Sequence, residues 1–375
     1  MRRLFAAREG HRHFGPTAPG QNGRQAQQLT TRQDEIRHAT LQDVANRAGV
    51  SRATASLVVR GTGRVSQRTR DRVHQVMDEL GYVYNRSAAS LRAGRSNVIG
   101  VLVTTVTNPF FAEVIVGLEQ RLARLGYVSL LANTLNDADR QARLVTFLQE
   151  SNVAGVVMVP AFTTDPRTLH SLAAREIPLL FLTRTAGEEP DLYLRTDDVA
   201  DGELAADHLF RHGCRTVAYL GGPTDSVARR DHLAGARAAA ERHNISPERL
   251  IDITSPTTAR GGLAAGRQLL AGESACDGII CHSDDIALGV YRALHDAGRA
   301  ASIPVISFDD VGHAELMEPP LTTIRRQPLE FGRRAAQLLH DRLTGAITGP
   351  VTSVVPSELT IRRSCGCRPD SPRTD

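Results

Sequence analysis

The 375-residue sequence contains no lysine and no tryptophan, and only 4% of its residues are aromatic. Without lysine, the chain lacks the amine nucleophile of a Schiff-base enzyme and the lysine with which a P-loop holds nucleotide phosphates. All 45 basic residues are therefore arginine. A genome rich in G and C would produce the same bias, so the arginine content by itself does not indicate a function.

Long apolar segments are also absent. The sequence has no run of about 18 apolar residues, the length that a transmembrane helix needs. At its start, Met1–Arg3 is followed by only four apolar residues before Arg8, which is too short for the apolar core of a secretory signal. We therefore expect a cytoplasmic protein without membrane contact.

The five cysteines are an odd number, and buried free thiols are the expected state inside a cell. One residue separates Cys365 from Cys367, whereas about two to four residues separate the cysteines of a structural zinc pair. The sequence also has no second pair of cysteines. His282, Ser283 and Asp284 are adjacent, so their side chains diverge and cannot form a nucleophilic relay. The sequence therefore predicts no catalytic site, no metal site and no cofactor.

Charge is distributed unevenly along the chain. Residues 1–97 contain 17 arginines and 7 acidic residues, a net charge of +10, whereas residues 98–375 carry a net charge of −6. A basic head on an acidic body is typical of a protein in which only the head contacts a polyphosphate. On charge alone, a solvated basic extension is an equally good interpretation.

The first part of the chain separates into an extension and a helical head. Residues 1–38 are polar and show no sustained period, which predicts a disordered basic extension. Three short helical patterns follow over 39–84, and a tight turn with glycine separates the first two. Their expected N-cap residues are Thr40, Ser51 and Ser66. This arrangement favours a helix-turn-helix domain, with a plain three-helix bundle as the alternative.

From Val98 onward, short β-branched runs alternate with helical stretches. The runs lie at 98–103, 127–131, 153–159, 178–182, 216–220, 278–281 and 304–308. This alternation predicts an α/β fold of doubly wound parallel sheets covered by helices. About 270 residues are too many for one sheet, so two lobes are expected, with a ligand at the carboxyl ends of the strands.

Three segments resemble the DNA-binding head of the lac repressor family. They are TLQDVANRAGVSRATAS (40–56), VSQRTRDRV (65–73) and LGYVYNRSAASLR (80–92). The resemblance covers roughly residues 39–368 and implies a transcriptional regulator, with a sensor domain similar to type I periplasmic binding proteins. It implies a hinge helix and linker at 85–97, an effector-binding and dimerisation domain at 98–368, and a tail at 369–375. The chain would pass between lobes near 196, 326 and 356, giving lobe one (about 98–196 and 327–355) and lobe two (about 197–326 and 356–368).

The resemblance also implies which residues contact DNA. At the start of the second helix, Arg52 can donate two hydrogen bonds to a guanine, and Ala53 can contact a thymine methyl group. Leu91 in the hinge corresponds to a side chain that the family inserts between base pairs in the minor groove. Leu57 stands where many members have a base-reading arginine, so the resemblance does not define the half-site. The candidates are Thr40, Ser51, Arg52, Ala53, Thr54, Ser56, Leu57, Arg60, Arg64, Asn85, Ala88 and Leu91.

A second set of residues is implied for effector binding: Asn108, Phe110, Phe111, Arg184, His232, Ser283 and Asp309. An aromatic pair suits the apolar face of a sugar, and a carboxylate such as Asp309 accepts hydrogen bonds from hydroxyl groups. By itself, such an aromatic pair more often belongs to a core, and acids such as Asp309 could be helix caps. His232, Ser283 and Thr183 replace the arginine, asparagine and aspartate that are common in relatives. The sequence therefore predicts a sugar or sugar acid as the effector but does not identify which one.

The predicted mechanism is a switch between sensor and DNA. A homodimer, or a tetramer built from it, would present two heads to a palindromic operator in double-stranded DNA. An effector would change how the lobes meet, and so order or release the hinge. Release by an inducer is favoured over co-repression, although the sequence does not fix the sign. The alternatives are an exported solute-binding protein, which would have no helix-turn-helix, and a regulator whose pocket binds nothing.

Overall fold

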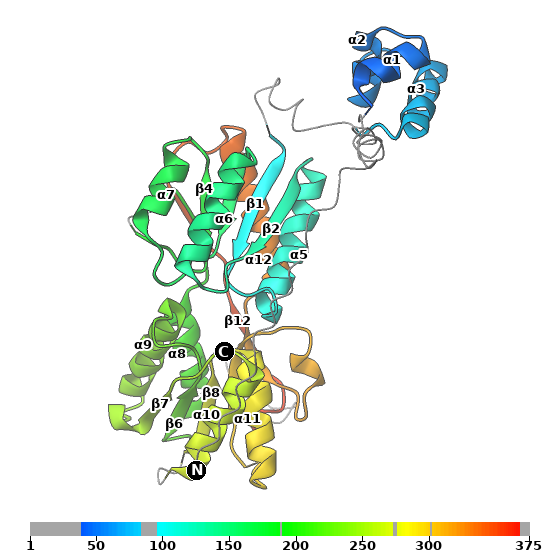
Figure 1. Ribbon diagram of the computed structural model, residues 1–375. Coiled ribbons are helices and arrows are strands. Elements are labelled where there is room, and N and C mark those ends of the chain that lie inside the picture. The colour runs from blue at the N-terminus through cyan, green and yellow to red at the C-terminus, as the bar shows by residue number, and fades with distance from the viewer. Residues whose placement is uncertain (1–38, 84–95, 188–189, 273–275, 301, 368–375) are drawn as a thin grey trace, which may run out of the picture. The chain divides into compact units, whose positions relative to one another are not determined.

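The computed structural model describes residues 39–83, 96–187, 190–272, 276–300 and 302–367 (Figure 1). The chain forms two compact units, Met1–Ala89 and Ser90–Asp375. The predicted extension over 1–38 and the hinge candidates Asn85, Ala88 and Leu91 lie outside the described residues. Among the helices of the described ranges, none is long and apolar enough to cross a membrane.

The described part of the first unit, residues 39–83, is a three-helix head. Its helices are α1 (Leu41–Ala48), α2 (Arg52–Val59) and α3 (Gln67–Leu80). Each helix is preceded by an N-cap residue whose hydroxyl accepts a hydrogen bond from the backbone N–H three residues later. These N-cap residues are Thr40, Ser51 and Ser66. Gly49 ends α1 at φ 64°, a left-handed conformation that favours glycine. The core consists of Val44, Ala48, Val58, Val73 and Val76.

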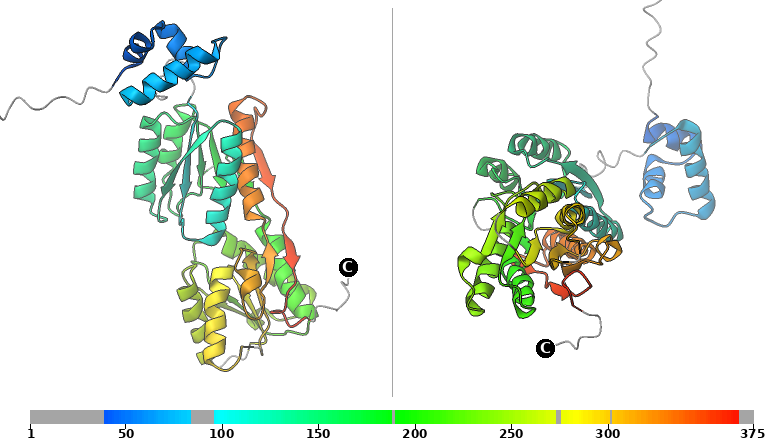
Figure 2. Two further views of the ribbon diagram at one scale, coloured as in Figure 1. Left: turned by 90° about the vertical axis from the view of Figure 1, so that its right-hand side faces the viewer. Right: turned by 90° about the horizontal axis from the view of Figure 1, so that it is seen from below.

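The second unit contains two separate sheets, one in each lobe (Figures 1 and 2). The lobe-one sheet has the order β11-β5-β4-β3-β1-β2 and is parallel throughout. Its strands are β1 (Val98–Val103), β2 (Val128–Asn133), β3 (Gly155–Met158), β4 (Leu179–Leu182), β5 (Leu192–Arg195) and β11 (Val351–Val354). The lobe-two sheet has the order β12-β10-β9-β8-β6-β7, with β12 antiparallel to β10. Its strands are β6 (Val217–Leu220), β7 (Leu250–Ile253), β8 (Gly278–Cys281), β9 (Val305–Asp309), β10 (Thr322–Arg325) and β12 (Glu358–Thr360).

Helices cover both faces of each sheet, so each lobe has two apolar core layers. In lobe one, α5 (Pro109–Arg124) and α12 (Pro328–Leu343) pack on one face. Helices α6 (Ala138–Glu150) and α7 (Pro166–Ala173) pack on the other. In lobe two, α8 (Asp198–Arg211) and α9 (Val227–Arg242) form one layer, and α10 (Ala259–Ala271) and α11 (Asp284–Asp296) the second. Two short 3-10 turns complete the fold, Pro247–Arg249 and Ala314–Leu316.

Glycine allows close approach of the helices within these layers. A Cβ added to Gly332 on α12 would lie 2.0 Å from the Val114 carbonyl oxygen of α5, and one added to Gly117 would lie 1.9 Å from the Leu329 carbonyl oxygen. Atoms cannot approach so closely, and the obstacle is backbone in both cases. The α5–α12 contact therefore depends on these two glycines.

We expect Gly332→Ala to lower the free energy of unfolding by about 3 kcal/mol, because the added methyl group must push two helices apart in a packed core. Urea unfolding monitored by circular dichroism measures this change. Gly349→Ala is the matched control, since nothing lies within 4 Å of a Cβ there. Equal stability of the two variants would contradict the close-packing interpretation.

Three segments join the lobes, at 196–197, 326–327 and 355–357, between β5 and α8, β10 and α12, and β11 and β12. Each segment follows the carboxyl end of a strand that runs parallel to its sheet neighbour. The carboxyl edges of both sheets therefore face the joining segments. This is the edge at which α/β proteins bind ligands.

Candidate DNA-binding face and effector site

The start of α2 presents the predicted base-reading residues to solvent. Ser51, Arg52 and Ala53 are exposed, whereas Ala55 and Val58 on the opposite side of the helix are buried in the head. The helix thus has one face fixed by packing and one free for a partner. This is the arrangement that a recognition helix needs in a major groove.

The other DNA-binding candidates of the head surround this face. Thr54 bonds to the Ser51 hydroxyl at 2.9 Å, so it contributes to the N-cap as well. The Nε of Arg60 donates to the Ser56 carbonyl at 3.1 Å, which holds the arginine along the end of α2. Leu57 is half-buried. Thr40, Arg60 and Arg64 are exposed.

In lobe one, the structure places Arg184 at the carboxyl edge of the sheet. Its Nε donates to the Pro160 carbonyl at 2.7 Å, and its Nη2 donates to Asn136 Oδ1 at 3.0 Å. The guanidinium lies 4.1 Å from the centre of the Phe162 ring, and burial lowers the pKa of Arg184 to about 10. It remains charged at neutral pH and is held in one position.

The turn that carries Arg184 is strained. Thr183 has φ 60°, a conformation that a β-branched residue rarely adopts. Hydrogen bonds to β5 hold it there: its N–H donates to the Leu194 carbonyl at 2.9 Å, and Tyr193 Oη donates to its carbonyl at 3.1 Å. Such strain is concentrated at functional sites, where the surrounding structure maintains it.

The predicted aromatic pair separates into two environments. Phe110 is 5% exposed and belongs to the lobe-one core, with its ring 6.1 Å from that of Phe331. Phe111 is only partly buried. Asn108 caps α5 by accepting a hydrogen bond from the Phe110 N–H at 2.9 Å. The Phe110 ring is packed in the core, so only Phe111 remains a candidate for ring contacts to a ligand.

In lobe two, Asp309 ends β9 in an unusual conformation. It has φ 111°, the next residue, Asp310, has φ 56°, and the side chain of Asp309 is almost wholly buried. Ser283 is a buried cap of α11, accepting from the Ile286 N–H at 3.4 Å. Asp284 accepts hydrogen bonds from the Thr323 hydroxyl and the Val311 N–H, both at 2.9 Å, and from the Ser307 hydroxyl. These bonds fix the loop that follows Asp309.

A buried arginine that was not predicted lies at the second joining segment. Arg326 Nη2 contacts Asp198, Asp201 Oδ2 at 3.0 Å and His232 Nε2 at 2.7 Å. Its Nη1 lies 4.0 Å from Asp309 Oδ1. Its Nε is buried without a hydrogen-bond partner. We call these five residues the Arg326 cluster.

The cluster connects all three joining segments. Thr196, in the first segment, donates to Asp198 Oδ1 at 2.9 Å, and Ser357, in the third, donates to Asp201 Oδ2 at 3.2 Å. Arg326 belongs to the second. Any rearrangement of the lobes that moves these segments must therefore change contacts of the same guanidinium.

His232 lies beneath the arginine and has no exposed surface. A guanidinium cannot accept a hydrogen bond, so His232 Nε2 must accept from Arg326, and Nδ1 must then carry the proton toward Tyr219 Oη at 2.8 Å. Tyr219 Oη in turn donates to His282 Nδ1 at 2.7 Å. The ring of His232 stacks on Phe308 at 3.8 Å. His232 therefore positions Arg326, and direct contact with an effector would require it to become exposed.

The electrostatics of the cluster follow from its burial. Burial lowers the pKa of His232 and that of His282, so both are neutral. Burial opposes ionisation of Asp198, but Arg326 together with His232 and Thr196 outweighs it and holds the pKa of Asp198 well below its usual range. Burial raises the pKa of Asp309 well above its ordinary value, with Arg326 opposing and Asp284 adding to the shift. Arg326 and Asp198 are thus a fixed ion pair.

The loop that follows Asp309 in lobe two makes contacts with lobe one. Val311 packs into the lobe-one core, and the Gly312 N–H donates to Glu113 Oε1 on α5 at 3.2 Å. In this contact, Glu113 is close in sequence to Phe111, and Gly312 is close in sequence to Asp309. A ligand bound at Asp309 would therefore act next to a contact between the lobes.

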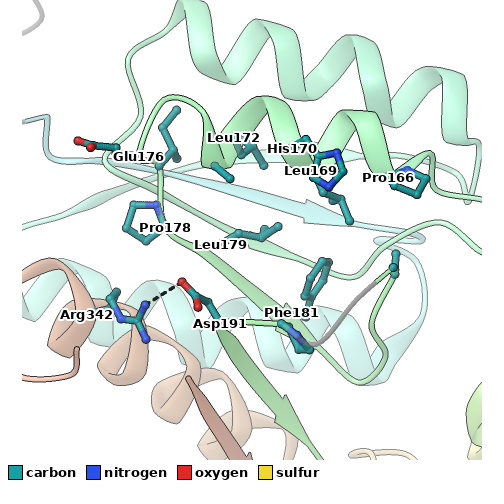
Figure 3. Close-up of a pocket in the computed structure, with 15 residues that line it drawn as sticks. Pro166, Leu169, His170, Leu172, Glu176, Pro178, Leu179, Phe181, Asp191 and Arg342 are labelled. Atoms are coloured by element: carbon teal, nitrogen blue, oxygen red, sulfur yellow. Dashed lines mark hydrogen bonds and ion pairs between the residues drawn. The ribbon is translucent and has the colours of Figure 1, made fainter. Parts of the chain in front are cut away.

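A cavity of about 560 Å³ lies elsewhere in lobe one, between α7, β4 and the end of α12 (Figure 3). Apolar side chains such as Leu169, Leu172 and Phe181 form most of its wall. Its Arg342 Nη1 pairs with Asp191 Oδ2 at 3.0 Å. Its wall offers one buried donor without a partner, Arg342 Nε, whereas recognition of hydroxyl groups needs several convergent polar groups, so we do not assign the effector to it.

Comparison with known proteins identifies the family. Residues 40–85 match the model for bacterial regulatory proteins of the lacI family, and residues 206–365 match that for a periplasmic binding protein-like domain. The HTH-type transcriptional regulator CelR of Thermobifida fusca is 32% identical over 337 residues, which are 88% of this chain and 98% of CelR. The chain belongs to the lacI family. As a lacI-family member it is a transcriptional regulator, and its relatives are regulators rather than enzymes.

Other lacI-family proteins extend the comparison. The ribose operon repressor of Escherichia coli (strain K12) is 32% identical over 308 residues, 82% of this chain and 93% of that protein. The crystal structure of the lac repressor dimer bound to operator and an anti-inducer matches with a TM-score of 0.76 and 27% identity, covering 87% of this chain and 99% of that chain. A structure of the CelR–cellobiose complex matches with a TM-score of 0.67 and 31% identity, again covering 87% of this chain and 99% of that chain. The predicted fold is confirmed.

Proposed function

We propose that this lacI-family regulator is a repressor that binds a palindromic operator as a homodimer and is released by a sugar or sugar acid. The observation that carries the proposal is the combination, in one chain, of an exposed α2 face with a sensor whose joining segments meet at one buried arginine. The head supplies a surface for DNA, and the Arg326 cluster supplies an element that a ligand can shift. A tetramer built from such dimers would need a further contact surface, because the first is already covered within each dimer.

Exposed apolar side chains support the homodimer. Val116 on α5 and Val128 and Leu131 on the edge strand β2 are each more than 40% exposed. An unpaired strand edge with apolar side chains is a surface that a second copy can cover. The lac repressor structure that resembles this chain is also that of a dimer bound to its operator.

Polar groups at the carboxyl edges support a hydroxylated effector. Arg184 presents a fixed guanidinium, Asp309 a buried carboxyl group, and Arg326 an Nε donor without a partner. Such groups form the charge-assisted hydrogen bonds by which sugars and sugar acids are recognised. The relatives include a regulator solved with cellobiose and a ribose operon repressor, so cellobiose and ribose are the first effectors to test.

We expect the full-length protein to bind an inverted repeat upstream of its own gene with two chains per site, and to lose at least about a hundredfold in affinity between 50 and 200 mM salt. The steep slope arises because arginines that contact phosphates release counterions. Arg52→Ala should weaken binding to this site by about 1–3 kcal/mol and hardly affect binding to scrambled DNA. Fluorescence anisotropy at several salt concentrations measures both effects.

Arg47→Ala is the control. This exposed arginine belongs to the same head but lies at the end of α1, where it pairs with Glu79. Its binding should stay within about 0.5 kcal/mol of the native protein. Equal affinity for the inverted repeat and for scrambled DNA would contradict the proposed function. So would one chain per site.

A further inference from the structure

Two histidines and a cysteine meet on the surface of lobe two, about 15 Å along α8 from the Arg326 cluster. Cys367 Sγ lies 3.3 Å from His208 Nε2 and 3.3 Å from His212 Nε2. The centres of the two imidazole rings are 4.5 Å apart. The three ligand atoms all lie within 4.8 Å of one another.

The local sequence explains why the histidines lie together. His208 and His212 are four residues apart, and the His212 N–H donates to the His208 carbonyl at 3.2 Å, so helical geometry continues through both. Residues at this spacing project from the same face of a helix. The pair is therefore pre-arranged to bind one ion, independently of the rest of the chain.

The cysteine arrives from the other end of the domain. Cys365 is buried in the lobe-two core, and Ser364 fixes the same segment by donating to the Val305 carbonyl at 2.6 Å. Gly366 then turns the chain at φ 80° and Cys367 follows, half-buried against the same core. The thiol is thus held against α8 by two anchored residues that precede it.

Hydrogen bonds can join these groups only in pairs: the thiol can donate its one proton to one imidazole nitrogen and accept weakly from the N–H of the other. A metal ion would bond to all three atoms. A tetrahedral zinc ion with Zn–N bonds of about 2.0–2.1 Å and a Zn–S bond of about 2.3 Å spaces its nitrogen and sulfur ligands about 3.5 Å apart, close to the two separations of 3.3 Å.

We propose that His208, His212 and Cys367 form a zinc-binding site with solvent as the fourth ligand. His212 is exposed and Cys367 half-buried, so an ion can enter from solvent. The bound ion would clamp the C-terminal segment to α8, and the site makes no use of the Arg326 cluster or the head.

The test uses the full-length protein, reduced and stripped of metal with EDTA. Cobalt(II) reports on the site because a cobalt–thiolate bond gives a charge-transfer absorption in the near ultraviolet, and tetrahedral cobalt absorbs strongly in the visible. We expect one equivalent of cobalt to produce both bands and one equivalent of zinc to abolish them. Cys367→Ser should lose the charge-transfer band, and His212→Ala should weaken binding at least tenfold.

Cys276→Ser is the matched control, since this buried cysteine lies in the other core layer of lobe two, and it should keep both bands. Zinc at a hundredfold excess over its Kd should raise the Tm of the native protein by about 5 °C, with no rise in Cys367→Ser. A measurement without substitution follows alkylation of Cys367 by mass spectrometry, and zinc should slow it at least tenfold. Absence of a thiolate band in the native protein, or alkylation of Cys367 that zinc does not slow, would overturn the proposal.

Discussion

Replacing Arg326 with methionine is expected to lower the free energy of unfolding by about 3–5 kcal/mol near neutral pH. The guanidinium is buried and pairs with Asp198 and Asp201, which are themselves buried. Methionine has a similar length but no charge, so it would leave two carboxylates in the interior without a counterion. Urea unfolding of the native and variant proteins measures the loss.

The pH dependence of this loss gives a sharper test. In the native protein the pKa of Asp198 is held below its unfolded value of about 3.9, so its contribution to stability is present above that pH and is lost as the pH falls. Without Arg326, burial should raise the pKa of Asp198 above the unfolded value. The folded state would then bind the proton more tightly, and the variant should gain stability as the pH falls from 7 toward about 4. The deficit of Arg326→Met should therefore shrink on acidification.

Arg325→Met is the matched control. The neighbouring arginine is half-exposed and pairs with Glu358 at 3.2 Å on the surface, a type of ion pair that contributes about 0–1 kcal/mol. Adding Asp198→Asn and Asp201→Asn to Arg326→Met should recover part of the lost stability, because the unpaired charges are then removed. A loss that is independent of pH, or equal in the two methionine variants, would contradict the ion-pair explanation.

The second large effect is expected at Asp309. Asp309→Ala should reduce effector affinity by about 10- to 150-fold, which corresponds to about 1.5–3 kcal/mol for effector hydroxyls left unpaired when the carboxyl group is lost. Operator binding should survive, because the head is a separate compact unit. If the effector acts as an inducer, the variant will stay on its operator in the presence of ligand; if it acts as a co-repressor, the variant will not repress.

A melting screen of cellobiose, ribose and related sugars on the native protein identifies the probe, and anisotropy with labelled operator then compares native and variant proteins. Asp296→Ala is the control, since this carboxylate lies at the far end of α11 and pairs with Arg267 of α10 and Arg292 of α11. Asp309→Asn distinguishes charge from packing, because it keeps the shape of the side chain. An unchanged response of Asp309→Ala at every ligand concentration would show that Asp309 has a structural role.

The head was predictable because its signals are local. Three N-cap hydroxyls, Gly49 and a helical apolar period lie within a few residues of the bonds that they form. The same is true of β1 and β8, each of which is a continuous apolar run with the predicted limits. Strands β5, β7, β10, β11 and β12 were not predicted, since they have three or four residues and include polar side chains.

The site was predictable only in part, for the same reason. Asp309 stands at the end of a recognisable strand, but Arg326 lies more than 120 residues from Asp198 and Asp201, and nothing local marks that it is buried. His232 was predicted as a ligand contact, whereas its neighbours Phe308 and Arg326, both far along the chain, enclose it. The spacing of His208 and His212 was a local signal that was missed, because its third partner lies at the other end of the domain.

The path of the chain between the lobes has a consequence for its synthesis on the ribosome. Lobe one begins at β1, yet its core is completed only by α12 and β11, which are made after most of lobe two. The final strand, β12, then returns to lobe two. A nascent chain that has emerged as far as Arg326 therefore exposes the face of α5 that α12 will cover. A premature stop between codons 327 and 354 would remove α12 or β11 from lobe one and β12 from lobe two, so nonsense mutations there should be null alleles rather than mild ones.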